Sequence, residues 1–93
     1  QLPINPENGE LVSDIEAAAK QSLTNVLEIV KEAGGKLENI IKVNIYVKDM
    51  NDFGKVNKVY EEFFGNHKPA RSCVEVARLP KDGVIEIEAI AYK

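Results

Sequence analysis

The chain has 93 residues, with 12 Lys and Arg against 15 Asp and Glu and a formal net charge of −3, which suffices for one small domain. The acidic balance without any basic cluster argues against a nucleic-acid partner, and no apolar run approaches the roughly 20 residues that would cross a membrane. The single cysteine cannot form an internal disulfide, so we expect a cytoplasmic protein of a reducing compartment.

The first expected element is a helix that begins at Ser13, after a turn at residues 5–10 that contains Asn-Pro and Asn-Gly. Ser13 and Glu16 have the spacing of a capping box, in which each side chain binds a free backbone N–H. Apolar residues then recur at helical spacing, and Gly34 and Gly35 favour a stop. These signals predict one amphipathic helix between Ser13 and Gly34.

Between residues 40 and 48 the apolar pattern becomes alternating, which predicts a strand with one buried face. The residues expected on that face are Ile41, Val43, Ile45 and Val47. Asn51 is then a suitable cap for a second helix, and Gly65 would end it. The apolar face of this helix comprises Phe53, Val56, Val59, Tyr60, Phe63 and Phe64.

Two further strands are expected over residues 70–78 and 84–92, where apolar and polar residues alternate. Asp82-Gly83 between them is a hairpin signal, so we expect these strands to pair antiparallel. The order of the elements predicts an α+β fold, with two helices on one face of a mixed sheet, in a single domain over residues 1–93.

The other face of the sheet is predicted to be half polar, which favours packing against another subunit with a ligand site at the seam. Its expected members are Asn44, Tyr46, Cys73, Glu75, Glu86 and Glu88. On the last strand, the residues expected to point the opposite way are Ile85, Ile87, Ala89 and Ala91.

Arg71 is the candidate binding residue that the pattern itself singles out. It begins a strand in an apolar run, and its planar fork of donors suits capture of a carboxylate, although a structural salt bridge explains it equally well. Glu86 and Glu88, expected on the partner strand of the hairpin, could hold a water for proton transfer or could form an ordinary exposed strand face.

Cys73 and a possible metal loop have simpler interpretations. Cys73 would need a base to act as a nucleophile, and the single histidine, His67, is expected in a loop. We therefore prefer to interpret Cys73 as a small apolar residue that packs in the core. Residues 49–54 are only loosely similar to a calcium loop, since Phe53 stands where an oxygen ligand is required. We therefore expect no metal site.

Several segments closely resemble the RidA/YjgF family, the reactive-intermediate deaminases that act on enamines and imines. The longest is PARSCVEVARLPKD at residues 69–82, followed by IEIEAIA at residues 85–91. The similarity continues through Asn-Pro and Gly-Glu within residues 5–10, QSLTNV at residues 21–26 and VKDMNDF at residues 47–53. It covers essentially the whole chain.

The resemblance implies a chorismate-mutase-like α+β fold and a homotrimer whose ligand sites lie between subunits. It also implies hydrolysis of 2-aminoacrylate-type enamines and imines, released by pyridoxal-phosphate enzymes, to 2-keto acids and ammonia without metal or cofactor. By matching positions, Arg71 would clamp the substrate carboxylate, Glu86 would activate the attacking water and Cys73 would line the pocket. Asn57 and Tyr60 match positions of the second helix near the cleft.

The chain departs from the family pattern at its start, where two strands, a Tyr near the pocket and a Ser-Gly pair are missing. Leu2 and Ile4 are therefore expected to be the tail of a strand in a longer domain, cut before Gln1. The alternative function is a non-catalytic module that binds small carboxylates at a trimer interface. Ribonuclease or translation-inhibitor activity has little support from the acidic charge and the single histidine.

Overall fold

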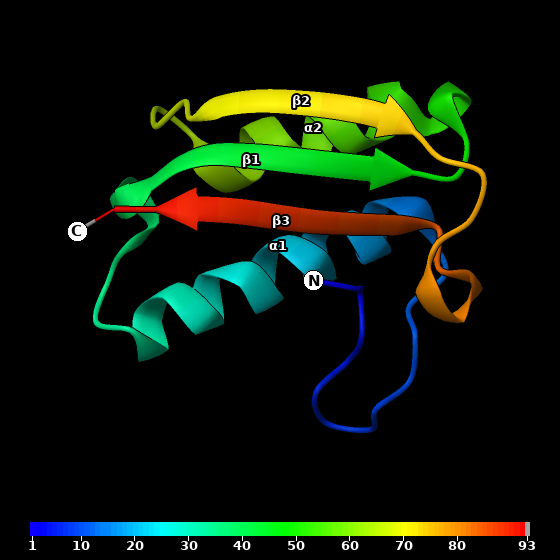
Figure 1. Ribbon diagram of the computed structural model, residues 1–93, viewed down its shortest axis with the longest axis horizontal. Helices are drawn as coiled ribbons and strands as arrows, with labels where there is room; N and C mark the ends of the chain where they lie inside the picture. Colours follow the sequence, from blue (N-terminus) through cyan, green and yellow to red (C-terminus); the bar gives the residue numbers. More distant parts are fainter. Residues whose placement is uncertain (93) are drawn as a thin grey trace.

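Two α-helices and three β-strands account for most of residues 1–92, the part of the chain that the computed structural model describes (Figure 1). The elements are α1 (Ile15–Glu32), β1 (Ile40–Val47), α2 (Phe53–Phe64), β2 (Ala70–Glu75) and β3 (Ile85–Ala91). Short 3-10 turns precede β1, α2 and β3. The type and order of the two helices and three strands predicted after Ser13 are confirmed, whereas the predicted strand tail at Leu2 and Ile4 is only an isolated bridge between Ile4 and Leu11.

β1 lies at the centre of the sheet, between β2 and β3 (Figure 1). It pairs parallel with β2 and antiparallel with β3, so the predicted hairpin of the last two strands is wrong. After β2 the chain crosses the end of β1. There the N–H of Val76 donates to the carbonyl of Val47 at 2.9 Å, and the N–H of Lys48 donates to the carbonyl of Val84 at 3.1 Å.

The Asp-Gly pair fails as a hairpin signal because the backbone at Gly83 is extended. A two-residue turn of this type needs positive φ at both of its central residues. Here the positive angles fall one residue earlier, at Lys81 (φ 57°) and Asp82 (φ 55°), whereas Gly83 has φ −62°. The buried side chain of Leu79 anchors this connection, which carries the chain from one edge of the sheet to the other.

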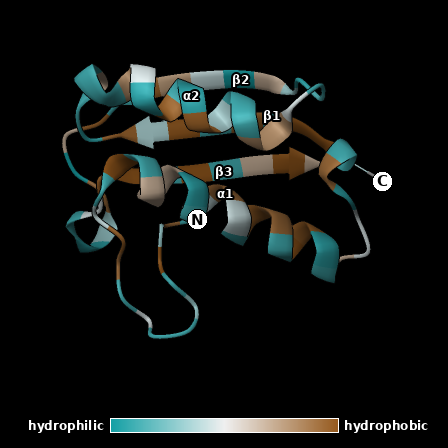
Figure 2. Ribbon diagram, turned by 180° about the vertical axis from the view of Figure 1, so that it is seen from behind, coloured by the Kyte–Doolittle hydropathy of each residue, from teal (hydrophilic) through white to brown (hydrophobic). Residues whose placement is uncertain are grey.

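Both helices cover the same face of the sheet, and Figure 2 shows them in front of it. The strands contribute Val43, Ile45, Val47, Ile85 and Ile87 to the core between the layers, and the helices contribute Ile15, Ala18, Ala19, Leu23, Val26, Val56, Tyr60 and Phe64. The predicted α+β class, with two helices on one face of a mixed sheet, is confirmed.

The start of β1 departs from the predicted alternation. Ile40 is fully buried and Ile41 is 50% exposed, which is the reverse of what the alternating pattern predicts. The pairing of β1 with β3 shifts register between Ile40 and Lys42, and such a bulge moves neighbouring side chains to the other face. Ile41 was therefore wrongly placed on the buried face.

The cap of α1 is Asp14, and the predicted capping box of Ser13 and Glu16 is wrong. Asp14 Oδ2 accepts a hydrogen bond from the N–H of Ala17 at 3.1 Å. A carboxylate at this position satisfies a free backbone donor and also places a negative charge at the positive end of the helix.

Asn51 is not the cap of α2, because a 3-10 turn over Met50–Asp52 precedes that helix. Asp49 Oδ1 accepts from the N–H of Asn51 at 2.9 Å, so the carboxylate before the turn organises this corner. Gly65 follows the last residue of α2 with φ 59°, as its predicted role as a helix stop requires.

The cap assignment can be tested by two neighbouring substitutions. Asp14→Ala should lower the free energy of unfolding by about 0.5–2 kcal/mol, because it removes the hydrogen bond to Ala17. Ser13→Ala should leave that free energy nearly unchanged, since Ser13 is exposed and the capping contact belongs to Asp14. Urea unfolding followed by circular dichroism measures both free energies. A larger loss of stability in Ser13→Ala than in Asp14→Ala would favour the predicted capping box instead.

Candidate functional site

Arg71 projects from β2 toward α2, on the helix-covered face of the sheet. Its Nη1 donates a hydrogen bond to Oδ1 of Asn57. Its guanidinium carbon lies 4.7 Å from the centre of the Tyr60 ring and 5.6 Å from that of Phe53. The faces of aromatic rings attract a cation at such distances, so one side of α2 holds the guanidinium in a fixed orientation.

In the described part of one copy of the chain, no salt bridge accounts for the position of Arg71. No carboxylate within residues 1–92 lies at ion-pair distance from Arg71, and the residue is exposed. A cavity of about 150 Å³ adjoins it, and the lining includes Tyr60, Phe64, His67, Lys68 and Pro69. An oriented guanidinium without a carboxylate partner beside an open cavity is suited to bind an anion.

Tyr60 contributes both to the core and to the surroundings of Arg71. Its side chain is buried, and its hydroxyl donates to the carbonyl of Pro69 at 3.4 Å. Burial raises the pKa of Tyr60, an effect that the nearby charge of Arg71 partly offsets. Tyr60 is therefore a neutral phenol at physiological pH. Its ring contacts the guanidinium of Arg71, and its hydroxyl is hydrogen-bonded to the loop before β2.

Cys73 lies two residues after Arg71 and faces the same way, partly buried against the core. Burial raises the pKa of the Cys73 thiol more than the charge of Arg71 lowers it, so the neutral thiol predominates near neutral pH. Nε2 of His67 lies 2.6 Å from the carbonyl oxygen of Ile40, and no hydrogen bond within residues 1–92 joins His67 to Cys73. These observations favour the interpretation of Cys73 as a small residue packed against the core rather than a nucleophile.

The sheet face away from the helices, called the open face below, differs from its prediction on β2. Asn44, Tyr46, Glu86 and Glu88 lie on it as predicted, but Cys73 and Glu75 do not. In the parallel pairing, Cys73 stands beside Ile45 and Glu75 beside Val47, so both face the helices. At the paired positions of the sheet, the open face consists of Ala70, Ser72, Val74, Lys42, Asn44, Tyr46, Glu86, Glu88 and Ile90.

Glu86 and Glu88 lie side by side on the open face, but their surroundings differ. Oε1 of Glu88 accepts hydrogen bonds from the hydroxyl of Tyr46 at 2.8 Å and from Nδ2 of Asn44 at 3.0 Å. Glu86 accepts no side-chain hydrogen bond within residues 1–92. Of the two carboxylates, Glu86 is the one left available to bind a water or a ligand.

Arg71 and Glu86 do not meet within one copy of the chain. Arg71 lies beside Val43 on the helix-covered face, whereas Glu86 lies beside Tyr46 on the open face. β1 also separates the strands that carry them. A small ligand could contact both side chains only if Arg71 and Glu86 came from different copies.

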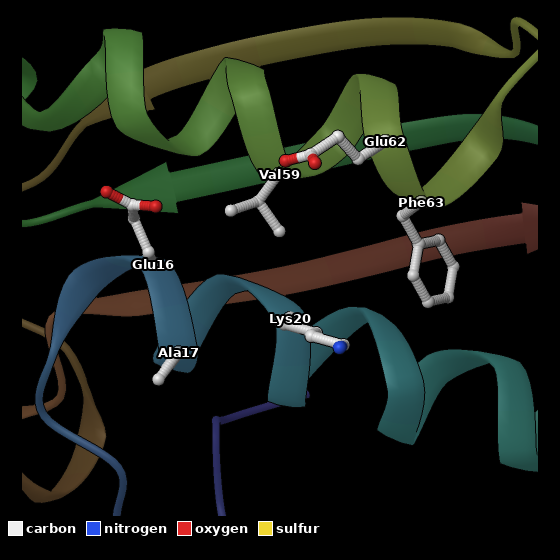
Figure 3. A pocket seen from close by; sticks show the side chains of 6 residues that line it. All are labelled: Glu16, Ala17, Lys20, Val59, Glu62 and Phe63. Atoms are coloured by element: carbon white, nitrogen blue, oxygen red, sulfur yellow. The ribbon is translucent and has the colours of Figure 1, made fainter.

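A groove of about 500 Å³ lies between α1 and α2, on the outer side of the helix layer (Figure 3). Its lining is Glu16, Ala17, Lys20, Val59, Glu62 and Phe63. None of the candidate residues is among them, so size alone does not indicate the site. Within residues 1–92 no cluster of three metal-ligating side chains occurs, and no helix is long and apolar enough to span a membrane.

The fold is that of an α+β protein in which α2 orients Arg71 on the helix-covered face of the sheet. The chain belongs to the family described as Endoribonuclease L-PSP, whose model matches residues 1–93. It is 57% identical over 96 residues to the 2-iminobutanoate/2-iminopropanoate deaminase of Escherichia coli strain K12, covering 100% of this chain and 75% of that protein. A RutC family protein of Pyrococcus abyssi is 55% identical over 94 residues, covering 100% of this chain and 74% of that protein.

Solved structures agree with this assignment. The YjgF gene product from E. coli has a TM-score of 0.94 at 57% identity, covering 98% of this chain and 74% of that one. E. coli TdcF with bound serine has a TM-score of 0.96 at 48% identity, covering 100% of this chain and 76% of that one. The resemblance to the RidA/YjgF family, based on the C-terminal signature, is thereby confirmed.

Proposed function

We propose that this chain is an enamine/imine deaminase. It hydrolyses 2-aminoacrylate-type intermediates released by pyridoxal-phosphate enzymes to 2-keto acids and ammonia. The main support is Arg71, which Asn57, Tyr60 and Phe53 hold in place with no carboxylate partner within residues 1–92. Such a guanidinium suits the carboxylate that every 2-imino acid carries. The E. coli relative that is 57% identical bears the name of this activity.

In the proposed reaction the enamine first gains a proton at carbon and loses one from nitrogen, which converts it to the imine. Arg71 binds the carboxylate, which fixes the imine carbon near one water molecule. Glu86 accepts a proton from that water as its oxygen attacks the carbon, and the nitrogen is protonated. The resulting carbinolamine then loses ammonia and leaves the 2-keto acid. This sequence needs no cofactor, and Cys73 lines the pocket without forming a covalent bond.

The site combines Arg71 of one copy with Glu86 of a neighbouring copy. The positions of Arg71 and Glu86 on opposite faces of the same sheet support this arrangement, because one copy does not bring the two residues together. A homotrimer with its sites between subunits supplies such pairs, and the mixed polar and apolar open face is suited to contact another copy. We place this assembly in the cytoplasm and assign it no nucleic-acid or membrane partner.

A non-catalytic module that binds small carboxylates is the second candidate. It is favoured by the geometry of a single copy, in which Arg71 can bind an anion without Glu86 nearby. The neighbour structure of TdcF with bound serine also supports binding of a small amino or keto acid. Intrinsic ribonuclease activity is the least supported, because the net charge is −3 and no basic cluster is present in the sequence.

One pair of experiments separates the two candidates. A serine dehydratase generates 2-aminoacrylate in the presence of the purified chain, and the decay of the enamine is followed spectroscopically. In parallel, calorimetry measures the binding of 2-ketobutyrate. We expect faster enamine decay together with binding; binding without any acceleration would identify the carboxylate-binding module instead.

A further inference from the structure

One side of α2 presents three residues to the guanidinium of Arg71, and none of the three is charged. Phe53, Asn57 and Tyr60 are spaced by four and then three residues, so they lie along one side of the helix. Oδ1 of Asn57 accepts a hydrogen bond from Nη1 of Arg71, and the two aromatic rings lie 5.6 and 4.7 Å from the guanidinium carbon. The helix therefore holds this cation with neutral groups.

The hydrogen bond to Asn57 leaves one edge of the guanidinium complete. A carboxylate binds an arginine most strongly through two parallel N–H groups on the same edge. Asn57 occupies Nη1, whereas Nε and Nη2 of Arg71 have no hydrogen-bond partner in the part of the chain that the structure describes. The edge formed by Nε and Nη2 can therefore donate both of its hydrogen bonds to one carboxylate.

An amide oxygen at position 57 orients the guanidinium without neutralising it. An aspartate would have nearly the same shape and would accept the same hydrogen bond, but it would form an ion pair with Arg71. Any further carboxylate would then compete with that aspartate for one positive charge. The neutral acceptor keeps the charge of Arg71 for carboxylates from outside its own copy. In the proposed site these are the carboxylates of the substrate and of Glu86 from a neighbouring copy.

A purely structural role for this bond, as a clamp between α2 and β2, has less support. Three buried side chains already fix the helix to the sheet, namely Val56, Tyr60 and Phe64. On the face of β2 that carries Arg71, Oε1 of Glu75 also accepts a hydrogen bond from the N–H of Met50 at 2.7 Å, just before the helix. Because these contacts position α2, the main effect of the Asn57 bond is on the guanidinium.

We propose that Asn57 is a positioning residue, which orients Arg71 for the substrate carboxylate and keeps the charge of Arg71 available. This inference rests on the proposed function, in which Arg71 binds that carboxylate. Asn57 need not touch the substrate, because its amide oxygen is bonded to Arg71. Its effect should therefore reach the reaction only through Arg71.

Asn57→Asp gives the sharpest test, because it should weaken ligand binding without lowering stability. Calorimetry measures the Kd of 2-ketobutyrate, and thermal unfolding followed by circular dichroism measures stability on the same samples. We expect Kd to rise by about 10- to 100-fold, since the new carboxylate pairs with Arg71 and repels the ligand. The midpoint of unfolding should equal that of the parent or exceed it, because an ion pair replaces a neutral acceptor. A structural clamp would move neither Kd nor activity in this variant.

Two further variants separate orientation from a general effect of charge. Asn57→Ala leaves the charge of Arg71 but removes the acceptor that orients it, so Kd should rise by only about 3- to 10-fold. Asn51→Asp adds a negative charge to the exposed turn before α2. It should leave Kd close to the parent value, because water and salt screen a charge at the surface.

A double-mutant cycle shows whether Asn57 acts through Arg71. Single-turnover decay of 2-aminoacrylate gives kcat/KM for the parent, for Asn57→Ala, for Arg71→Ala and for the double variant. We expect Asn57→Ala to lower kcat/KM by about 3- to 10-fold in the parent and to have almost no further effect once residue 71 is alanine.

Two results would overturn the role of Asn57 while leaving the deaminase intact. One is an Asn57→Asp variant that binds 2-ketobutyrate as tightly as the parent. The other is an equal loss from Asn57→Ala with and without Arg71, which would indicate a direct contact with the substrate. A parent that neither consumes the enamine nor binds 2-ketobutyrate would instead remove the proposed site as a whole. A parent that binds without turnover would overturn the deaminase alone, and the Kd of Asn57→Asp would still decide the role of Asn57.

Discussion

Arg71→Ala should lower kcat/KM for 2-aminoacrylate by about two to three orders of magnitude, because it removes the charge-assisted hydrogen bonds to the substrate carboxylate. The chain should still fold, since Arg71 is exposed and loses only its contacts with α2, which are worth about 1 kcal/mol. Single-turnover decay of the enamine with excess protein measures the loss directly. A variant that consumes the enamine as fast as the parent would remove Arg71 from the site.

Two further variants at arginine positions make this result specific. Arg71→Lys keeps the charge but loses the planar fork, so it should recover only part of the activity. Arg78→Ala removes another exposed guanidinium, which pairs with Asp82 at 2.8 Å and is not one of the proposed site residues. It should retain the parent rate. Equal losses in Arg78→Ala and Arg71→Ala would indicate a general effect of positive charge rather than a binding residue.

Ile45→Ala should lower the free energy of unfolding by about 2–5 kcal/mol, the cost typical of a large-to-small substitution in a packed core. Ile45 is 1% exposed and lies on the central strand, between both neighbouring strands and beneath the helices. A chain of this size has little stability in reserve, so the variant should be largely unfolded near 37 °C. Urea unfolding followed by far-UV circular dichroism gives the value.

Ile29→Ala is the matched control, because Ile29 is 52% exposed on α1. Its free energy of unfolding should stay within about 0.5 kcal/mol of the parent value. Similar losses in both variants would mean that the layer between the sheet and the helices is not the main core.

The sequence predicts the elements better than it predicts how the strands are arranged. The helical spacing before Gly34 and the alternation in residues 40–48 each report on a single segment, and both elements form as predicted. The order of the strands depends instead on which edge of β1 the last strand pairs with, and this is decided by the connection between β2 and β3. The Asp-Gly signal at Asp82 cannot reveal that Lys81 takes one of the two positive φ angles while Gly83 is extended.

The family resemblance proposes residues for the site, but the sequence could not predict how they are arranged. The family resemblance identifies Arg71 and Glu86, but alternation alone cannot say which side of β2 faces the helices, because both sides of this edge strand are mostly exposed. The prediction therefore placed Cys73 on the wrong face. The pairing of Tyr46 with Glu88 was also missed, although alternation had placed both on one face.

The most direct test of a site shared between copies is the co-expression of Arg71→Ala with Glu86→Gln, each carrying its own tag. Each variant alone should be nearly inactive. In every mixed trimer one site of the three joins an intact Arg71 to an intact Glu86, so the doubly tagged assembly should regain about a third of the parent rate. Mixed assemblies as inactive as the separate variants would contradict a site that combines Arg71 of one copy with Glu86 of another.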